Sequence, residues 1–181
     1  LDAPIDLVLD WWGDTDAGGR ELKVWAGSMR GVRIARAMKN ALGAVEHARR
    51  LFDYAAVVFD PDNQTKKVEP YYFDSRRGCN AQSIDIGFAP DSLKMTTGAY
   101  PGVEFLCLVG LQRFRPATTS QRRVFTYCTW AEPLPARTAP TAACGIVGLR
   151  GSHGFRFENA FRTSQKKHKS FLPATPIGDC S

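Results

Sequence analysis

The sequence has few of the residues on which metal-dependent and nucleophilic catalysis depend. Its 181 residues include only 3 histidines, and these are far apart. It has no H-x-x-x-H pair, no G-x-S-x-G turn, no Walker loop and no dinucleotide-binding fingerprint. These absences argue against the common hydrolases, P-loop NTPases and dinucleotide-dependent enzymes. We therefore predict that the protein is not an enzyme and requires no metal or other cofactor.

Cysteines are also few, and their spacing is unsuited to a structural framework. The 5 cysteines are odd in number, widely spaced and include no C-x-x-C pair. This pattern argues against a disulfide framework or a zinc knuckle and favours a reducing compartment. We interpret Cys107, Cys128 and Cys144 as small core residues. No signal peptide and no apolar run of roughly 20 residues is visible, so we expect a cytoplasmic protein without a membrane partner.

The residues that the chain does contain favour one folded domain with a basic surface. Hydrophobic residues make up 44% of the chain and charged residues 23%, which is typical of a folded globule. We expect residues 1–181 to form a single compact domain. Because the chain starts at Leu1, we expect this domain to be the C-terminal part of a longer polypeptide. The formal net charge of +6 favours an anionic partner.

Hydrophobic periodicity predicts an α+β fold with a largely antiparallel sheet and two main helices. An apolar stripe of 3.6-residue period predicts one long helix over residues 29–52, whose outer face is cationic and either solvated or in contact with nucleic acid. Pro101 and the apolar run up to residue 111 predict a second, buried helix. Proline and Asx chemistry predict a turn at residues 60–63. Apolar or alternating segments predict strands at residues 5–12, 21–25, 54–59, 68–73, 82–88, 122–130 and 155–158.

The strongest candidate for a binding site lies in residues 154–177, where an aromatic, strand-like segment leads into a cationic turn. Closely spaced cations repel one another unless water or an anion neutralises them. The turn is therefore either a solvated loop or a contact with a phosphate backbone, to which a nearby arginine adds a hydrogen-bond donor. The residues concerned are Arg162, Lys166, Lys167, His168 and Lys169.

A second candidate combines an aromatic ring with paired arginines. Tyr72 is followed closely by Arg76 and Arg77. Such a group can stack on a base while it holds phosphates. It can equally be a strand end followed by a solvated turn, and the sequence leaves both interpretations open. The acidic residues Asp53, Asp60 and Asp62 are better interpreted as turn and cap residues than as metal ligands.

Several longer segments carry a family resemblance. They are residues 23–27 (KVWAG), 51–54 (LFDY), 67–74 (KVEPYYFD), 103–106 (VEFL), 110–116 (GLQRFRP), 157–163 (FENAFRT) and 166–169 (KKHK). Together they resemble the CRISPR-associated Csb family of type I-U (I-G) systems. The resemblance covers about residues 25–175 and is greatest to the member treated as a compact form of the effector's large subunit.

The resemblance implies a noncatalytic, nucleic-acid-binding subunit of an RNA-guided surveillance complex (Cascade) in antiviral defence. The implied partners are guide RNA, target DNA, the backbone and guide-processing subunits of Cascade, and the helicase-nuclease effector. In such complexes base pairing with the guide reads the target sequence, while large-subunit proteins hold the guide and read a short duplex motif.

Two other functions fit the same residues. A metal-independent endoribonuclease that processes guide RNA would use His153 or His168 as acid or base, with lysines stabilising charge. Alternatively, the basic surface would meet an acidic protein in an interaction scaffold.

Overall fold

The computed structural model of the chain describes residues 31–71, 73–74, 98–161 and 169–180. The fold is α+β with antiparallel sheets, which confirms the predicted fold class. The helices are α1 (Gly31–Ala41), α2 (Pro101–Leu111) and α3 (Ala139–Ala143). The strands are β1 (Phe59–Asp60), β2 (Asn63–Lys67), β3 (Ala117–Thr118), β4 (Val124–Thr129), β5 (His153–Phe161), β6 (Lys169–Phe171) and β7 (Thr175–Asp179).

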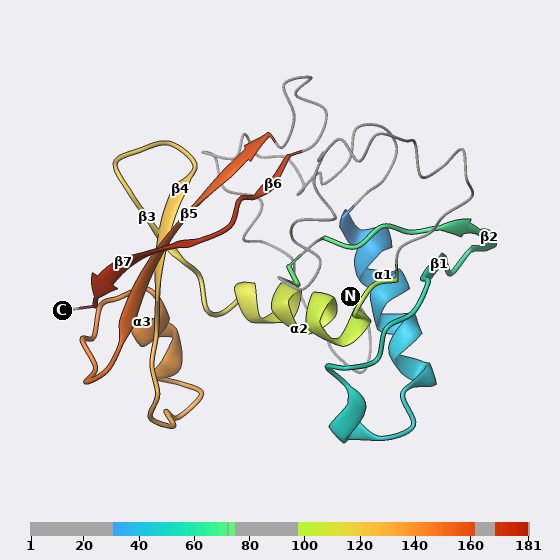
Figure 1. Cartoon of the computed structure of the whole chain (residues 1–181), viewed down its shortest axis with the longest axis horizontal. Coiled ribbons are helices and arrows are strands. Elements are labelled where there is room, and N and C mark those ends of the chain that lie inside the picture. Colours follow the sequence, from blue (N-terminus) through green and yellow to red (C-terminus); the bar gives the residue numbers. More distant parts are fainter. Residues whose placement is uncertain (1–30, 72, 75–97, 162–168, 181) are drawn as a thin grey trace.

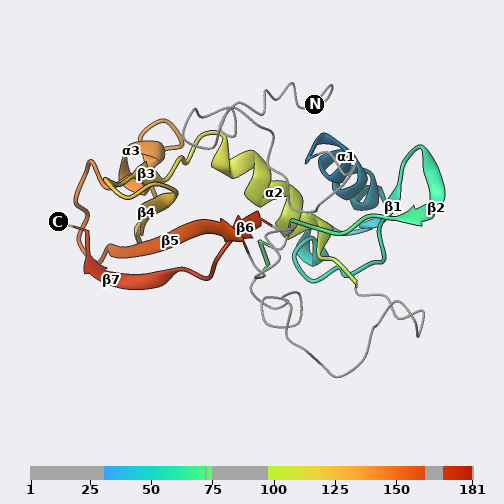
Figure 2. The same ribbon diagram turned by 90° about the horizontal axis from the view of Figure 1, so that it is seen from above.

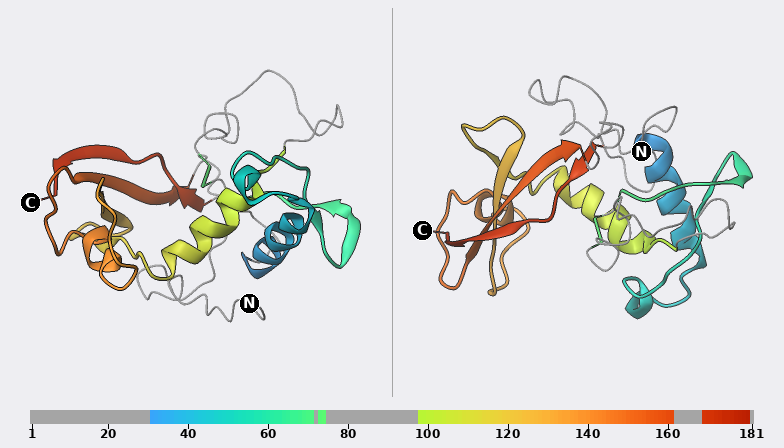
Figure 3. Two further views of the ribbon diagram at one scale, coloured as in Figure 1. Left: turned by 90° about the horizontal axis from the view of Figure 1, so that it is seen from below. Right: turned by 45° about the horizontal axis from the view of Figure 1, so that its top comes forward.

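Helix α2 lies between two groups of elements. Figure 1 shows α1 and the β1–β2 hairpin on one side of it, and the larger sheet with α3 on the other. The views from above and from below keep the same order (Figure 2, Figure 3). Helix α2 packs on α1, and α3 packs on β4. No described helix is both long and apolar enough to span a bilayer.

Helix α1 buries the stripe that its sequence predicts. Ile34 and Met38 are fully buried with Ala35 and Ala37, while Arg33 is exposed on the other face. Full burial of a side chain such as Ile or Met contributes roughly 1.5–3 kcal/mol. The stripe packs against residues from α2 and from the chain around the hairpin, namely Val58, Val68, Tyr71, Ala99, Phe105 and Leu108.

The prediction of one helix over residues 29–52 is wrong beyond Ala41. A 3-10 turn (Leu42–Ala44) follows α1, and Val45 then adopts an extended conformation. Gly43 lies in this turn, where glycine disfavours an α-helix by about 1 kcal/mol relative to alanine. Phe52, which the stripe would bury, is 54% exposed. The apolar periodicity of the sequence continues to Phe52, but the hydrophobic core does not extend that far.

Helix α2 confirms the helix predicted from Pro101, which occupies the first turn where its missing N–H is not needed. The helix is not buried throughout, because Leu106 is 38% exposed. Gly102, the residue after Pro101, allows α2 to approach the backbone of Leu51 closely. A Cβ on Gly102 would lie 2.2 Å from the backbone oxygen of Leu51. Glu104 is fully buried, and its Oε1 accepts a 3.2 Å hydrogen bond from the backbone N–H of Asp74.

The first hairpin confirms the turn at residues 60–63 but corrects the strands around it. Strands β1 and β2 pair antiparallel, and Oδ1 of Asp60 accepts a 3.0 Å hydrogen bond from the N–H of Asp62. The strand predicted at 54–59 is reduced to β1 and a single bridge at Ala56. The strand predicted at 68–73 is wrong, because β2 ends at residue 67. Tyr71 is buried there instead, with its hydroxyl donating to the Gly31 carbonyl.

The larger sheet has the order β3-β4-β5-β6, with β7 also paired to β5. It confirms the strands predicted at 122–130 and 155–158. On β5, Phe157 is buried while Arg156 and Glu158 are exposed, as the alternation predicts. Phe157 stacks on Phe125 of β4 with ring centroids 5.4 Å apart. The strands predicted at 5–12, 21–25 and 82–88 lie outside the described residues.

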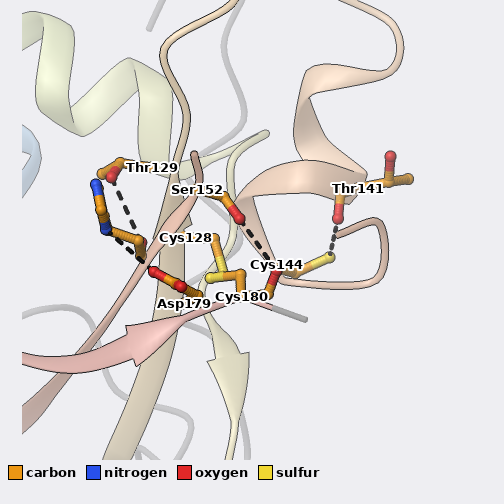
Figure 4. The surroundings of a disulfide bond; sticks show 8 residues. Cys128, Thr129, Thr141, Cys144, Ser152, Asp179 and Cys180 are labelled. Carbon is orange, nitrogen blue, oxygen red and sulfur yellow. Dashed lines mark hydrogen bonds and ion pairs between the residues drawn. A yellow bond between two sulfur atoms is a disulfide. The ribbon is translucent and has the colours of Figure 1, made fainter. Parts of the chain in front are cut away.

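A disulfide joins β4 to the residue that follows β7. Cys128 is bonded to Cys180, with 6.2 Å between the Cα atoms and a separation of 52 positions in sequence (Figure 4). The hydroxyl of Ser152 also donates to the Cys180 carbonyl at 3.1 Å. The expectation that Cys128 is an unpaired core residue is therefore wrong. Pairing across 52 residues depends on the sheet's topology, which the spacing of cysteines does not reveal.

Candidate functional site

The structure places one of the predicted cationic site residues. Lys169 begins β6, where it pairs with Phe161 of β5. The other predicted residues lie outside the described part of the chain: Tyr72, Arg76, Arg77, Arg162, Lys166, Lys167 and His168.

The strands that precede and follow residues 162–168 in sequence form one long antiparallel hairpin. Strand β6 pairs with the C-terminal end of β5, and β7 pairs with its N-terminal end, where His153 faces Asp179. Between them, the N–H of Leu172 donates to the carbonyl of Glu158 at 2.8 Å. The return strand therefore follows one edge of β5, while β4 pairs with the other edge. Residues 162–168 connect the two arms of this hairpin in sequence.

The cationic face of α1 is partly neutralised by the first hairpin. Nη1 and Nη2 of Arg36 donate to the two carboxylate oxygens of Asp62 at 3.2 and 3.3 Å. Arg33 lies 3.8 Å from a carboxylate oxygen of Asp60, which is buried beneath it. The two aspartates thus act in a turn and as partners of α1. Because these residues are at least 26 positions apart, sequence periodicity alone did not indicate the pairs.

His153, one of the two histidines that the ribonuclease hypothesis names, lies beside an aspartate on the surface. Its Nδ1 lies 3.5 Å from Oδ1 of Asp179, and both side chains are mainly exposed. The hydroxyl of Thr129 donates to the backbone carbonyl of the histidine at 3.4 Å. The contact between His153 and Asp179 joins β5 to β7 at the edge of the sheet. Within the described ranges, no three His, Cys, Asp or Glu side chains are arranged to hold a metal ion.

A cavity of about 520 Å³ lies between α2 and the larger sheet. Helix α2 and the chain after it form one wall, and β4 and β5 form another, with α3 and the link before β7 at the margins. Among the described side chains that line it, none is charged. The lining residues are mainly apolar or aromatic: Phe73, Cys107, Gly110, Leu111, Phe114, Pro116, Tyr127, Cys128, Thr129, Trp130, Ala143, Phe157, Leu172 and Ala174.

The thiol of Cys107, which lines this cavity, is in a partly desolvated environment. The thiol is free and exposed, so its interpretation as a core residue is wrong. The pKa of Cys107 is nevertheless raised to about 11, mainly by burial and to a smaller extent by the negative charges of Glu104 and Asp74. Exposure and desolvation are compatible, because a thiol in a hollow can be reached by solvent while neighbouring atoms displace most of its hydration. Burial also raises the pKa of Tyr127.

The sequence analysis did not predict the cavity, although the composition of the α2 segment gave an indication of it. Its segment is apolar on nearly every side, whereas a surface helix normally has a polar face. It also contains Gly110 near its end, although glycine destabilises a helix by roughly 0.5–1 kcal/mol relative to alanine. The walls come from segments far apart in the chain, so their meeting required the tertiary structure.

Comparison with family models, with curated proteins and with solved structures finds no match to this chain.

Proposed function

We propose that the protein is a noncatalytic, nucleic-acid-binding subunit of a type I CRISPR surveillance complex. In this role it contacts the phosphate backbone of guide RNA or target DNA. One structural observation supports the contact. Because Phe161 pairs with Lys169, the cations Arg162, Lys166, Lys167 and His168 belong to the connection between two paired strands. Four basic residues within the seven positions 162–168, together with the net charge of +6, favour a polyanionic partner.

The assignment to a CRISPR complex rests on the resemblance of the quoted segments to the Csb family. In that setting the partners are guide RNA, target DNA and the other Cascade subunits, and the helicase-nuclease acts afterwards. The proposal also places the protein in the cytoplasm. The bond between Cys128 and Cys180 argues against that location, because disulfides are rare in reducing compartments.

The experiment is a binding titration of the purified protein with single-stranded RNA, single-stranded DNA and duplex DNA over a series of salt concentrations. The test variant replaces Lys166, Lys167 and Lys169 by Glu. A phosphate contact contributes about 0.7 units of log–log salt slope on a single strand and about 0.9 on a duplex. Loss of three contacts should therefore reduce the slope by about 2 to 3 units and weaken binding strongly at low salt.

The matched control replaces Lys66, Arg137 and Arg150 by Glu, which changes the net charge by the same amount at exposed positions. The proposal requires the control to bind much more tightly than the test variant. Equal loss in both variants would mean that net charge, and not this connection, governs binding. Absence of binding by the unaltered protein would reject the proposal.

A further inference from the structure

We propose that the cavity between α2 and the larger sheet is a binding site for a neutral, hydrophobic small molecule. This inference goes beyond the proposed contact with nucleic acid and does not depend on it. It rests on the size of the cavity, the chemistry of its lining and the presence of a glycine in one wall.

The volume suits a small organic molecule. At about 520 Å³, the cavity falls within the range of roughly 300–1,000 Å³ that is typical of ligand pockets. Aromatic rings approach from several segments, with Phe114 following α2 and Tyr127 and Trp130 on or next to β4. Such walls favour a ligand with a ring or a branched apolar body, which they contact over a large area.

The lining selects against a charged ligand. Its polar side chains are few, and the hydroxyl of Thr129 already donates to the His153 carbonyl. The others are chiefly the thiol of Cys107, the hydroxyl of Tyr127 and the indole N–H of Trp130. An anion that entered would lose hydration and would lie near the negative charges of Glu104 and Asp74, which already act on the Cys107 thiol. A cation would lose hydration without contacting an opposite charge in the lining itself. The raised pKa values of Cys107 and Tyr127 keep both groups neutral at physiological pH. The few donors can orient a ligand through one or two hydrogen bonds.

The glycine at position 110 supports the proposal that the cavity accommodates a ligand. A Cβ on Gly102 would collide with Leu51, so packing requires that glycine. A Cβ on Gly110 would meet no atom within 4 Å, so packing does not require the second one, although it weakens the helix. Gly110 lines the cavity, and a side chain there would occupy part of it. We infer that this position keeps room for a ligand.

The test uses the neutral fluorescent probe N-phenyl-1-naphthylamine and the whole chain. The unaltered protein should bind it saturably, with a blue shift and an increase in emission. Gly110→Leu places a side chain in the cavity and should weaken binding at least tenfold. Gly43→Leu is the matched control, because a Cβ there also meets no atom within 4 Å and Gly43 does not line the cavity. This control should bind the probe as the unaltered protein does.

A second readout uses the thiol in the cavity. In a Cys79→Ser, Cys144→Ser background, saturating probe should slow the alkylation of Cys107 several-fold. This protection decides the question if Gly110→Leu fails to give a cooperative melting curve. No saturable binding, equal binding by Gly110→Leu, or unprotected Cys107 would each overturn the proposal. Tighter binding of the anionic 8-anilinonaphthalene-1-sulfonate than of the neutral probe would also overturn it.

The two proposals fail separately. The variant with Lys166, Lys167 and Lys169 replaced by Glu should keep full affinity for the probe, and Gly110→Leu should keep its affinity for nucleic acid. Binding of the probe should also change little with salt, because no charge is neutralised.

Discussion

The thiol of Cys107 should react slowly at neutral pH, although it is exposed. Its pKa is raised from 9.0 to about 11, first by desolvation and then by the negative charges of Glu104 and Asp74. Only the thiolate is the nucleophile in thiol–disulfide exchange. The perturbation to apply is pH, and the reaction is exchange with the neutral disulfide 4,4′-dithiodipyridine.

The size of the effect follows from two opposing terms. Below pH 9, raising the pKa by about two units lowers the thiolate fraction about 100-fold. A more basic thiolate is also a better nucleophile, with a Brønsted coefficient of about 0.4–0.5, which restores roughly six- to tenfold. Cys107 should therefore react roughly 10- to 15-fold more slowly at pH 8 than an unperturbed thiol.

The assay measures the rate of thiopyridone release from pH 7 to pH 10 in the Cys79→Ser, Cys144→Ser background. The logarithm of the rate should rise with a slope of one throughout, whereas an unperturbed thiol levels off near pH 9. In Glu104→Gln the levelling should move to lower pH but stay above 9, because desolvation is the largest cause. A plateau near pH 9 in the unaltered chain would refute this reasoning.

Three further predictions concern packing, the disulfide and catalysis. Gly102→Ala should lower the free energy of unfolding by about 1–3 kcal/mol in urea titrations, since its Cβ would lie 2.2 Å from the Leu51 oxygen; unchanged stability would contradict the close approach. Replacing Cys128 and Cys180 by Ser should cost about 4 kcal/mol in the same assay, because the bond spans 52 residues; no loss would mean that the bond constrains nothing. Repeat RNA incubated without divalent ions should remain intact with the unaltered protein, and cleavage that His153→Ala abolishes would favour the ribonuclease hypothesis.

Local signals predicted the elements whose determinants are contiguous. Pro101 and the apolar run after it define α2, because the fixed backbone of proline suits a first turn. Alternation around Phe157 defines β5, since one face of that strand is buried. The residues around Asp60 form the predicted turn, where a carboxylate accepts a backbone N–H two positions away. Each of these depends on neighbours within a few residues.

Periodicity was misleading where burial depended on distant contacts. Apolar residues continue in register as far as Phe52, but of those in the described stretch 42–52 only Leu42 packs against the core, and α1 ends at Ala41. Val68 and Tyr71 belong to no strand, and they are buried because they pack in one core with residues of α1 and α2. The cationic site predicted around Lys169 remains a prediction, since only its strand pairing is described.

The sequence by itself determined the α+β class, the second helix, the central strands and the basic character of the chain, because composition and short-range patterns carry that information. Only the tertiary structure decided that Cys128 meets Cys180, that Arg36 pairs with Asp62, and that α2 and β4 line an apolar cavity. Those contacts join residues separated by tens of positions. Their formation depends on how the elements pack, and no local pattern specifies that packing.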